Sequence, residues 1–198
     1  MARAPLPPDL LAGLAALEAS YLAETDPIRQ SGFGGGARRW RLEREPVLEA
    51  VEGDGDFLDA GCANGYLLEC LVRWARARGV VLTPHGLDQD PGLVALARAR
   101  LPRHAGNLHV ANAWDFAPPR PYRYVYTLDD VVPASFLAEH LRRIHREWLE
   151  RGGRMIVGSY GSSSRRRAPG DVAAFLRELG FRVAGAAAGG TPPVTSFA

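Results

Sequence analysis

The sequence predicts an α/β fold, a doubly wound and mostly parallel seven-stranded sheet with helices on both faces and an antiparallel last strand. From about residue 56, short apolar runs typical of buried strands alternate with amphipathic helical stretches, which is the pattern of parallel sheets. Near residue 190 a GGTPP turn joins the last two expected strands, and so short a connection permits only an antiparallel pair.

A helical lead-in is expected over residues 1–50, before a core of residues 51–198, within one structural domain overall. Its first helix is expected from about Asp9, a good N-cap, to about Glu24. The apolar residues at helical spacing in this helix are Leu10, Leu14, Leu17 and Tyr21. A joint of glycines follows at residues 32–36, so we expect the helix to dock over the core and lift away as a lid.

A second helical stretch is expected up to Val51, with Pro46 starting or kinking it. Strands are then expected at residues 57–60, 80–87, 108–111, 122–128 and 154–158, from 181 onward, and at 194–198. Helices are expected between them at 66–78, from Asp90 to about 101, from Pro133 to the glycines at 152–153, and at 171–179.

Composition excludes several kinds of chemistry. All 24 basic residues are arginine, so a Schiff-base lysine and a phosphate-loop lysine are both ruled out. The net charge of +2 does not indicate nucleic acid as the partner. Two cysteines and five histidines have no metal-ligand spacing, so no metal is expected. No apolar run reaches the ~20 residues of a membrane span, and the start does not read as a signal peptide, so a cytoplasmic protein is expected.

The first expected strand runs into a tight glycine loop, FLDAGCANGYLLE. Gly61 and Gly65 bracket this loop before a helix N-terminus, where free amides and close backbone approach suit a ligand. A dinucleotide fingerprint would need glycine at Ala63 and Tyr66 as well, so that interpretation is disfavoured.

The segment LDAGCANG resembles the glycine-rich motif of class I S-adenosylmethionine-dependent methyltransferases, with Ala63 in place of the middle glycine. The segments GLDQDP, HVANAWDF and LERGGRMIVGSYG resemble later parts of that family in the same order, and GFGGGARRWRLER is similar to the lead-in of a group of its bacterial members. The resemblance covers roughly residues 50–198 and implies a Rossmann-like fold, S-adenosylmethionine as cofactor and methyl transfer.

Within this resemblance, Asp88 is expected to accept both ribose hydroxyls, and Asn112 to accept from the adenine amino group with its side-chain oxygen. Trp114 either walls the adenine or caps the core. Asp59 is expected to orient the loop or the cofactor's amino group. The residues expected to bind cofactor are Asp59, Gly61, Cys62, Ala63, Gly65, Asp88, Gln89, Asn112, Ala113, Trp114 and Thr127. Cys62 is interpreted as a small packing residue rather than a nucleophile.

Asp129 and Asp130 follow the fourth expected strand and are the candidates for a catalytic base or an acceptor-binding pair, unless one of them caps the next helix. Arg41, with Arg39 beside it, is a candidate for binding a carboxylate, with a solvated helix face as the alternative. Tyr126 and Tyr160 are candidates for orienting the acceptor, or else core residues.

A small-molecule acceptor, methylated on oxygen or nitrogen, is favoured because TLDD stands where some amino-group methylases carry N-P-P-[YF]. Two alternatives stay open. One is a nucleic-acid or protein methyltransferase that uses Arg38–Arg39 and Arg165–Arg167 as a binding edge. The other is a non-catalytic module of the same fold. No membrane partner is expected, and the protein is expected to be a monomer or a homodimer.

Overall fold

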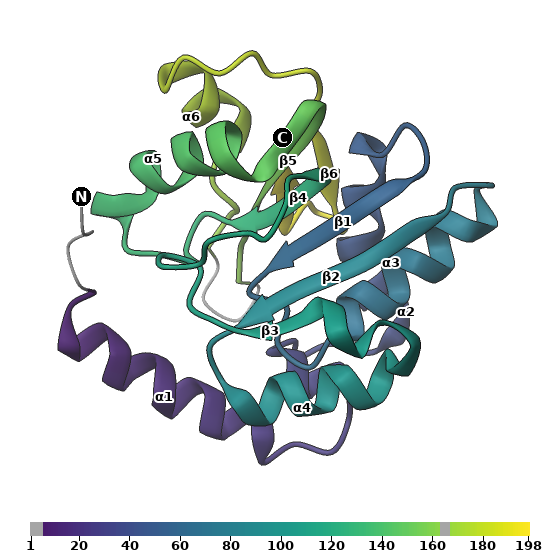
Figure 1. Ribbon diagram of the computed structural model, residues 1–198, viewed down its shortest axis with the longest axis vertical. Coiled ribbons are helices and arrows are strands. Elements are labelled where there is room, and N and C mark those ends of the chain that lie inside the picture. Colours follow the sequence, from purple (N-terminus) through teal and green to yellow (C-terminus); the bar gives the residue numbers. More distant parts are fainter. Residues whose placement is uncertain (1–5, 163–166) are drawn as a thin grey trace.

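The computed structural model describes residues 6–162 and 167–198, so most of the arginine run at 165–167 lies outside the described residues. Seven strands form a single sheet in the order β3-β2-β1-β4-β5-β7-β6 (Figure 1). Strands β1 to β5 are parallel, and β7 is antiparallel to both β5 and β6. The strands are β1 (Gly55–Ala60), β2 (Leu82–Asp88), β3 (Leu108–Val110), β4 (Tyr122–Leu128), β5 (Leu149–Tyr160), β6 (Ala187–Gly189) and β7 (Thr195–Phe197). The predicted fold class is confirmed.

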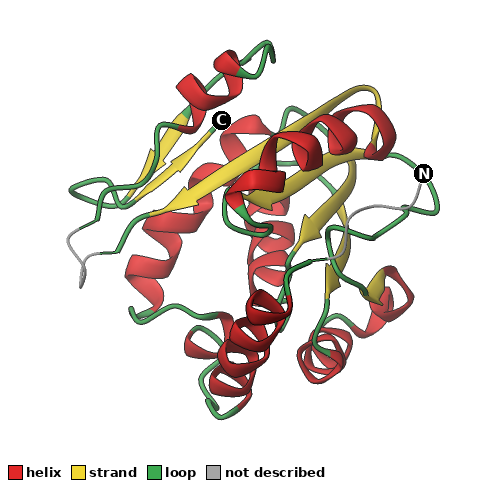
Figure 2. Cartoon of the chain, turned by 90° about the vertical axis from the view of Figure 1, so that its left-hand side faces the viewer, coloured by secondary structure: helices red, strands yellow, loops and turns green. Residues whose placement is uncertain are grey.

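Helices cover both faces of this sheet (Figure 2). Successive residues of a strand point to opposite faces, so Phe57 joins one apolar cluster and Leu58 the other. The first cluster packs under α2 (Ala37–Arg44), α3 (Tyr66–Ala77) and α4 (Pro91–Arg100). The second packs under α5 (Ala134–Arg143), a π-helical turn (Ile144–Trp148) and α6 (Val172–Glu178).

Two parts of the core differ from the sequence-based expectation. Strand β5 begins at Leu149 rather than residue 154, because the glycine pair forms a bulge in the strand instead of ending the helix. Gly152 supplies the positive φ of +79° that this bulge uses. No strand forms at 181–186, because β7 pairs only with residues 187–189, and β6 therefore starts only at Ala187.

The lead-in divides into a helix on the surface and a segment in the core. Helix α1 (Pro8–Leu22) begins one residue before Asp9, with Pro7 as its N-cap and no side-chain cap. Of its apolar residues, Leu14 and Tyr21 are half-buried and Leu17 is 46% exposed. Beyond it, Ile28, Phe33 and Trp40 belong to the first apolar cluster. A 3-10 helix (Glu45–Ala50) with Pro46 near its start then leads into β1, as expected.

Candidate functional site

The carboxyl ends of β1, β2 and β4 lie side by side at one edge of the sheet, next to the glycine loop at residues 61–65. Ala60 is level with Leu87 on β2 and with Thr127 on β4, so the predicted residues at these strand ends come together. Three loop residues take the left-handed conformation, Gly61 (φ +96°), Ala63 (φ +46°) and Gly65 (φ +72°). Ala63 is the position where alanine replaces the expected glycine, and the loop keeps its positive φ there at a cost in strain. The loop therefore has the tight shape that the motif predicted.

Gly65 and Cys62 fix the loop against its neighbours. A Cβ at Gly65 would lie 2.9 Å from the Cβ of Ala97, so only glycine allows α3 to begin this close to α4. The buried sulfur of Cys62 fills the space over Gly86, where an added Cβ would lie 2.8 Å from it. Burial raises the pKa of the Cys62 thiol well above its ordinary value, which agrees with a packing role.

Asp88 ties the loop to the start of α4. One carboxylate oxygen accepts the Ala63 N–H at 2.9 Å and the other accepts the Asp90 N–H at 3.1 Å. Burial raises the pKa of Asp88, and these backbone hydrogen bonds oppose the shift. Each oxygen keeps a second lone pair, so the carboxylate can still accept two further hydroxyl donors.

Asp59 is a buried carboxylate at the end of β1. Burial, with a smaller contribution from the charge of Asp88, raises the pKa of Asp59 to about 7. Among the described residues, none donates a hydrogen bond to its carboxylate and none forms an ion pair with it. A cationic group placed beside it would therefore be stabilised strongly.

A chain of side-chain hydrogen bonds runs from the end of β3 to α1. Asn112 donates to Gln89 at 2.6 Å, and Gln89 donates to Glu18 of α1 at 2.6 Å. The Asn112 oxygen, expected to accept from an adenine amino group, instead accepts the Trp114 N–H at 2.8 Å. Asn112 thus shapes the loop after β3, and since its oxygen keeps a second lone pair, the expected contact with an adenine amino group stays a prediction.

Trp114 is a core residue rather than a wall of the site. It is 1% exposed and stacks on Phe136 with ring centroids 4.9 Å apart. The buried guanidinium of Arg143 donates to the carbonyls of Ala113, Trp114 and Phe116 and fixes this loop from below. Of the two alternatives left open for Trp114, its burial favours core packing.

Asp129 and Asp130 lie beyond the end of β4, where the Asp129 N–H bonds the Gly158 carbonyl at 2.9 Å. Neither caps the next helix, because the N-cap of α5 is Pro133 without a side-chain cap. Asp130 is an exposed residue, but partial desolvation of its carboxyl group, then the charge of Asp129, raises its pKa. Tyr21 of α1 faces the same region, since burial and the charges of Asp130 and Asp88 raise the pKa of its phenol.

Tyr126 and Tyr160 share a hydrogen bond between their hydroxyl groups. The buried guanidinium of Arg44 lies 3.7 Å from the centre of the Tyr160 ring and also packs on Phe33 and Trp40. Burial raises the pKa of both tyrosines. Arg44 was missed from sequence, where it is one of four arginines in the seven-residue run RRWRLER. Its position four residues after Trp40, on the buried face of a helix, was the available signal.

Arg41 and Arg39 both form ion pairs within their own helical segment, and their role in binding a carboxylate stays a prediction. Arg41 is exposed and pairs with Glu45 at 2.7 Å beside Trp74. Arg78, at the far end of α3, shares that glutamate, so the group lies toward the opposite edge of the sheet. Arg39 pairs with Glu43 at 2.5 Å.

Asn64 is a second residue that sequence analysis missed. It is fully buried within the glycine loop and donates to the Pro27 carbonyl and to Gln30, each at 3.0 Å. Its own oxygen accepts the Tyr66 N–H at 3.1 Å. The lead-in around residues 27–30 is therefore bonded directly to the loop.

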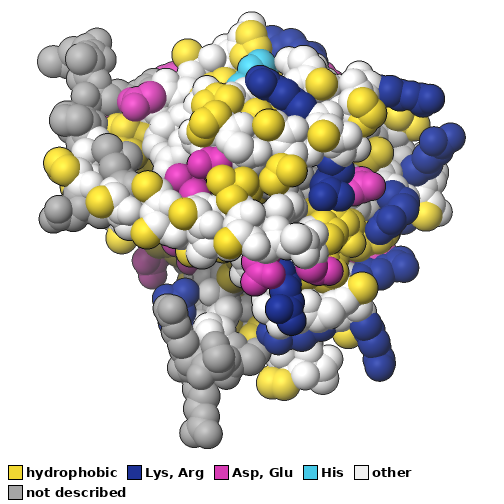
Figure 3. Space-filling view, turned by 90° about the horizontal axis from the view of Figure 1, so that it is seen from below, with side chains coloured by type: hydrophobic (Ala, Val, Ile, Leu, Met, Phe, Trp, Pro, Cys, Tyr) yellow, Lys and Arg dark blue, Asp and Glu magenta, His cyan; other side chains and the backbone are white. Residues whose placement is uncertain are grey.

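The charges are unevenly distributed over the surface. Arginine side chains gather on the right-hand side of the view from below, away from the side on which α1 lies (Figures 1 and 3).

No described helix is both long and apolar enough to cross a membrane. Over residues 6–162 and 167–198, no group of three histidine, cysteine or acidic residues is placed to hold a metal ion.

No family model matches the sequence, and no curated protein matches it. Solved structures do match it. The N-methyltransferase NodS from Bradyrhizobium japonicum WM9, in complex with S-adenosyl-L-homocysteine, is 15% identical over 92% of this chain and 94% of that one, with a TM-score of 0.68. DhpI in its S-adenosylhomocysteine complex is 17% identical over 94% and 92%, with a TM-score of 0.58.

The sugar N-methyltransferase KedS8 from Streptoalloteichus sp ATCC 53650 is 24% identical over 73% of this chain and 57% of that one, with a TM-score of 0.52. At these identities the matches establish the fold. The chain has the Rossmann-like fold of class I S-adenosylmethionine-dependent methyltransferases.

Proposed function

We propose that the protein binds S-adenosylmethionine at the carboxyl ends of β1 and β2 and transfers its methyl group to a small molecule. The observation that supports this most directly is the position of two acids, the buried Asp59 and the half-buried Asp88, on either side of a loop with positive φ at Gly61. Solved structures of this fold with S-adenosylhomocysteine bound support the same cofactor.

The charges of the site fit the cofactor. Asp88 would accept the ribose hydroxyls, because its two oxygens are fixed by the Ala63 and Asp90 amides. Asp59 would hold the ammonium group of the methionine part, since it has no partner among the described residues. Gly61 leaves the space that a side chain would fill, and Gln89 with Ala113 would border the adenine.

The cofactor supplies a methyl group already activated on a sulfonium, so the protein mainly has to align an acceptor and exclude water. Tyr21 and Glu18 of α1 would cover the site from the solvent side. Asp129 and Asp130 would hold the acceptor and take up its proton. Tyr126 and Tyr160 would form the floor near Asp59.

We propose nitrogen rather than oxygen as the methylated atom. Two neighbouring carboxylates suit an amine, which is cationic when it binds and must lose a proton before it attacks. The N-methyltransferases among the similar structures agree with this choice. The cytoplasmic location and the monomeric or homodimeric state stay predictions.

Titration calorimetry with S-adenosylmethionine and S-adenosylhomocysteine tests the cofactor, and we expect saturable binding of both. A panel of small primary and secondary amines, with matched alcohols, then tests the acceptor by formation of S-adenosylhomocysteine. Binding without turnover on any acceptor would favour the non-catalytic module. Turnover on RNA, DNA or protein alone would favour the macromolecular alternative, and absence of binding would overturn the proposal.

A further inference from the structure

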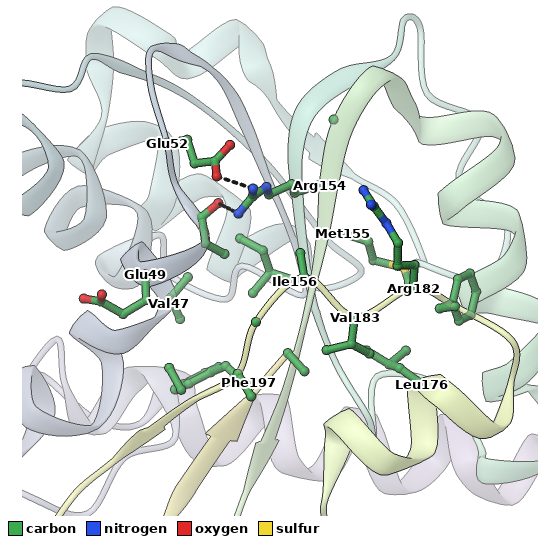
Figure 4. A pocket seen from close by; sticks show the side chains of 18 of the residues that line it. Val47, Glu49, Glu52, Arg154, Met155, Ile156, Leu176, Arg182, Val183 and Phe197 are labelled. Carbon is green, nitrogen blue, oxygen red and sulfur yellow. Dashed lines mark hydrogen bonds and ion pairs between the residues drawn. The ribbon is translucent and has the colours of Figure 1, made fainter.

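The two ends of β5 present their arginines differently. Beside the first half of the strand, Arg154 and Glu52 line a cavity of about 600 Å³, and the Arg154 guanidinium forms an ion pair with the Glu52 carboxylate (Figure 4). Beyond the carboxyl end of the strand, Arg167 is exposed and forms no ion pair with any residue that the structure describes. Arg167 therefore keeps its charge available at the end of β5 where the candidate site lies.

Backbone contacts fix Arg167 against the end of β5. Ser162 and Arg167 exchange two backbone hydrogen bonds, at 2.8 and 3.0 Å. An added Cβ at Gly161 would lie 2.5 Å from the Arg167 carbonyl oxygen, so a side chain there would displace this residue. The Arg167 guanidinium also donates one hydrogen bond to the Tyr160 carbonyl at 3.2 Å. Its place beside the strand end is thus determined by described residues.

The segment that follows Arg167 reaches Asp129. The Gly170 N–H donates to the hydroxyl oxygen of the buried Ser159 at 2.9 Å. An added Cβ at Gly170 would lie 3.5 Å from a carboxylate oxygen of Asp129, so the backbone there packs directly beside this acid. Residues 167–170 therefore form a wall of the candidate site next to its two neighbouring acids.

Asp130 and Arg167 lie within electrostatic reach of each other without forming an ion pair. Partial desolvation and the charge of Asp129 raise the pKa of Asp130, and the charge of Arg167 opposes this shift. No ion pair joins the two side chains directly. A ligand that carries both kinds of charge could therefore contact both of them at once.

These two kinds of charge select a ligand with two kinds of group. A guanidinium offers five N–H donors in a planar fork that fits a carboxylate or a phosphate, and the contact with Tyr160 uses one donor of Arg167. The carboxylates of Asp129 and Asp130 suit an ammonium group. An amine without an acidic group would meet the acids but leave Arg167 facing solvent, so it would bind more weakly.

We propose that the methyl acceptor is a zwitterion, with its amine at Asp129 and Asp130 and a carboxylate or phosphate at Arg167. This substrate class rests on the proposed N-methyl transfer. The ammonium group first gives a proton to one of the two carboxylates. The nitrogen lone pair then forms the bond to the methyl carbon, while the electrons of the broken carbon–sulfur bond stay on sulfur. Arg167 takes no part in that step and determines which amine binds.

Matched pairs of amines test the acidic group on the full chain. β-Alanine and β-alaninamide differ in the charge at one end, and phosphoethanolamine with ethanolamine forms a second pair that distinguishes phosphate from carboxylate. With saturating S-adenosylmethionine, we expect kcat/KM for at least one zwitterion to exceed that of its partner by at least about tenfold, mostly through KM.

Variants assign the preference to Arg167. Arg167→Gln should abolish it without changing the rate for β-alaninamide, and Arg167→Lys should retain part of it, because lysine keeps the charge but not the planar fork. Arg167→Glu should instead favour 1,3-diaminopropane over β-alanine. Arg76→Gln is the matched control, since it removes the same charge from an exposed position near the far end of α3 and should change nothing. Thermal unfolding checks that each variant is folded.

Calorimetry with S-adenosylhomocysteine tests the cofactor site separately. If that product binds but the partners without an acidic group react as fast as the zwitterions, or none of the four amines reacts, the zwitterionic acceptor is overturned and the cofactor site stands. A preference for zwitterions that survives in Arg167→Gln would overturn the role of Arg167. Absence of S-adenosylhomocysteine binding would overturn the proposed function, and this substrate class with it.

Discussion

At the scale of single residues, Asp88 acts on the site before any ligand arrives. Its carboxylate holds the N–H of Ala63, a residue whose positive φ is unfavourable for alanine, and so helps keep the loop in its strained shape. A substitution there should consequently affect both the ligand contact and the loop.

We expect Asp88→Ala to weaken S-adenosylhomocysteine binding by about 2–4 kcal/mol, from the loss of two charge-assisted hydrogen bonds. Asp88→Asn keeps the shape and one oxygen, so it should fall between the alanine variant and wild type. Calorimetry measures the affinities, and thermal unfolding checks that each variant is folded. A folded alanine variant that binds as tightly as wild type would contradict the role of Asp88.

Gly61→Val should abolish binding. Gly61 has φ +96°, and its added Cβ would lie 3.4 Å from a Val131 methyl group, on the side where the cofactor is proposed to sit. Gly79→Val is the matched control, because Gly79 also has a positive φ (+79°) but has no atom within 4 Å of its added Cβ. Both variants should lose stability through backbone strain, and only Gly61→Val should lose affinity. Equal affinity in the two would show that the loop does not approach the ligand.

Asp59 should make stability depend on pH in an unusual direction. Its pKa in the folded protein is about 7, above the ordinary value of 3.8, so the folded state holds a proton that the unfolded chain releases. The free energy of unfolding should therefore fall as pH rises from about 4 to about 7, by up to roughly 4 kcal/mol from this group. Denaturant unfolding of wild type and Asp59→Asn across that range measures the difference. An asparagine variant with the same pH profile as wild type would show that Asp59 is not the source.

The raised pKa of Asp59 should also appear as proton release when a ligand binds. An ammonium group beside Asp59 favours its ionised form, so S-adenosylhomocysteine should release a proton from wild type near pH 6.5. Calorimetry in buffers of different ionisation enthalpy counts that proton. Asp59→Asn should release less, and an unchanged count would place the ammonium group elsewhere.

At the scale of elements, α1 is held by few contacts. Its last turn packs on Gly32 and Gly92 through Tyr21 and Leu22, and Glu18 bonds Gln89. Partial burial raises the pKa of Glu18, which agrees with its carboxyl group lying against Gln89 at the edge of the site. A helix held in this way can open without disturbing the sheet.

We expect S-adenosylhomocysteine to slow hydrogen exchange in α1 while β1 and β2 change little. Glu18→Ala should speed exchange in α1 and reduce that slowing, because it removes the bond to Gln89. Glu24→Gln is the control, since no described side-chain contact involves the Glu24 carboxylate. Equal protection of α1 with and without ligand would make it a fixed part of the fold.

The sequence predicted elements and strand ends better than it predicted side-chain partners. Asp59, Asp88 and Thr127 come together because parallel strands end at one edge, and order along the chain was enough to predict that. The partners of Asn112 and Arg41 depend on loop geometry and on a helix orientation that periodicity does not determine. The absent strand at 181–186 reflects a short neighbour, since β7 pairs only with residues 187–189.

At the scale of the whole molecule, the lead-in is not a single lid. Trp40 is 3% exposed and Leu42, two residues later on α2, is 53% exposed. Trp40→Ala should therefore cost about 3–5 kcal/mol of stability, and Leu42→Ala about 0.5 kcal/mol or less. Chemical denaturation measures both, and a small loss at Trp40 would mean that α2 contributes little to the core.

Truncation extends this test to the division at residue 50. Removing residues 1–24 takes away α1 but leaves Ile28, Phe33 and Trp40 in place, so we expect a folded protein with a cooperative transition and weakened cofactor binding. Removing residues 1–50 also takes away Val47 and Leu48, both fully buried against the sheet, and we expect that chain not to fold. A folded, cooperative chain beginning at residue 51 would instead establish the lead-in as a separable unit, and the strand-end site would then have to bind its cofactor without Asn64 being held by Pro27 and Gln30.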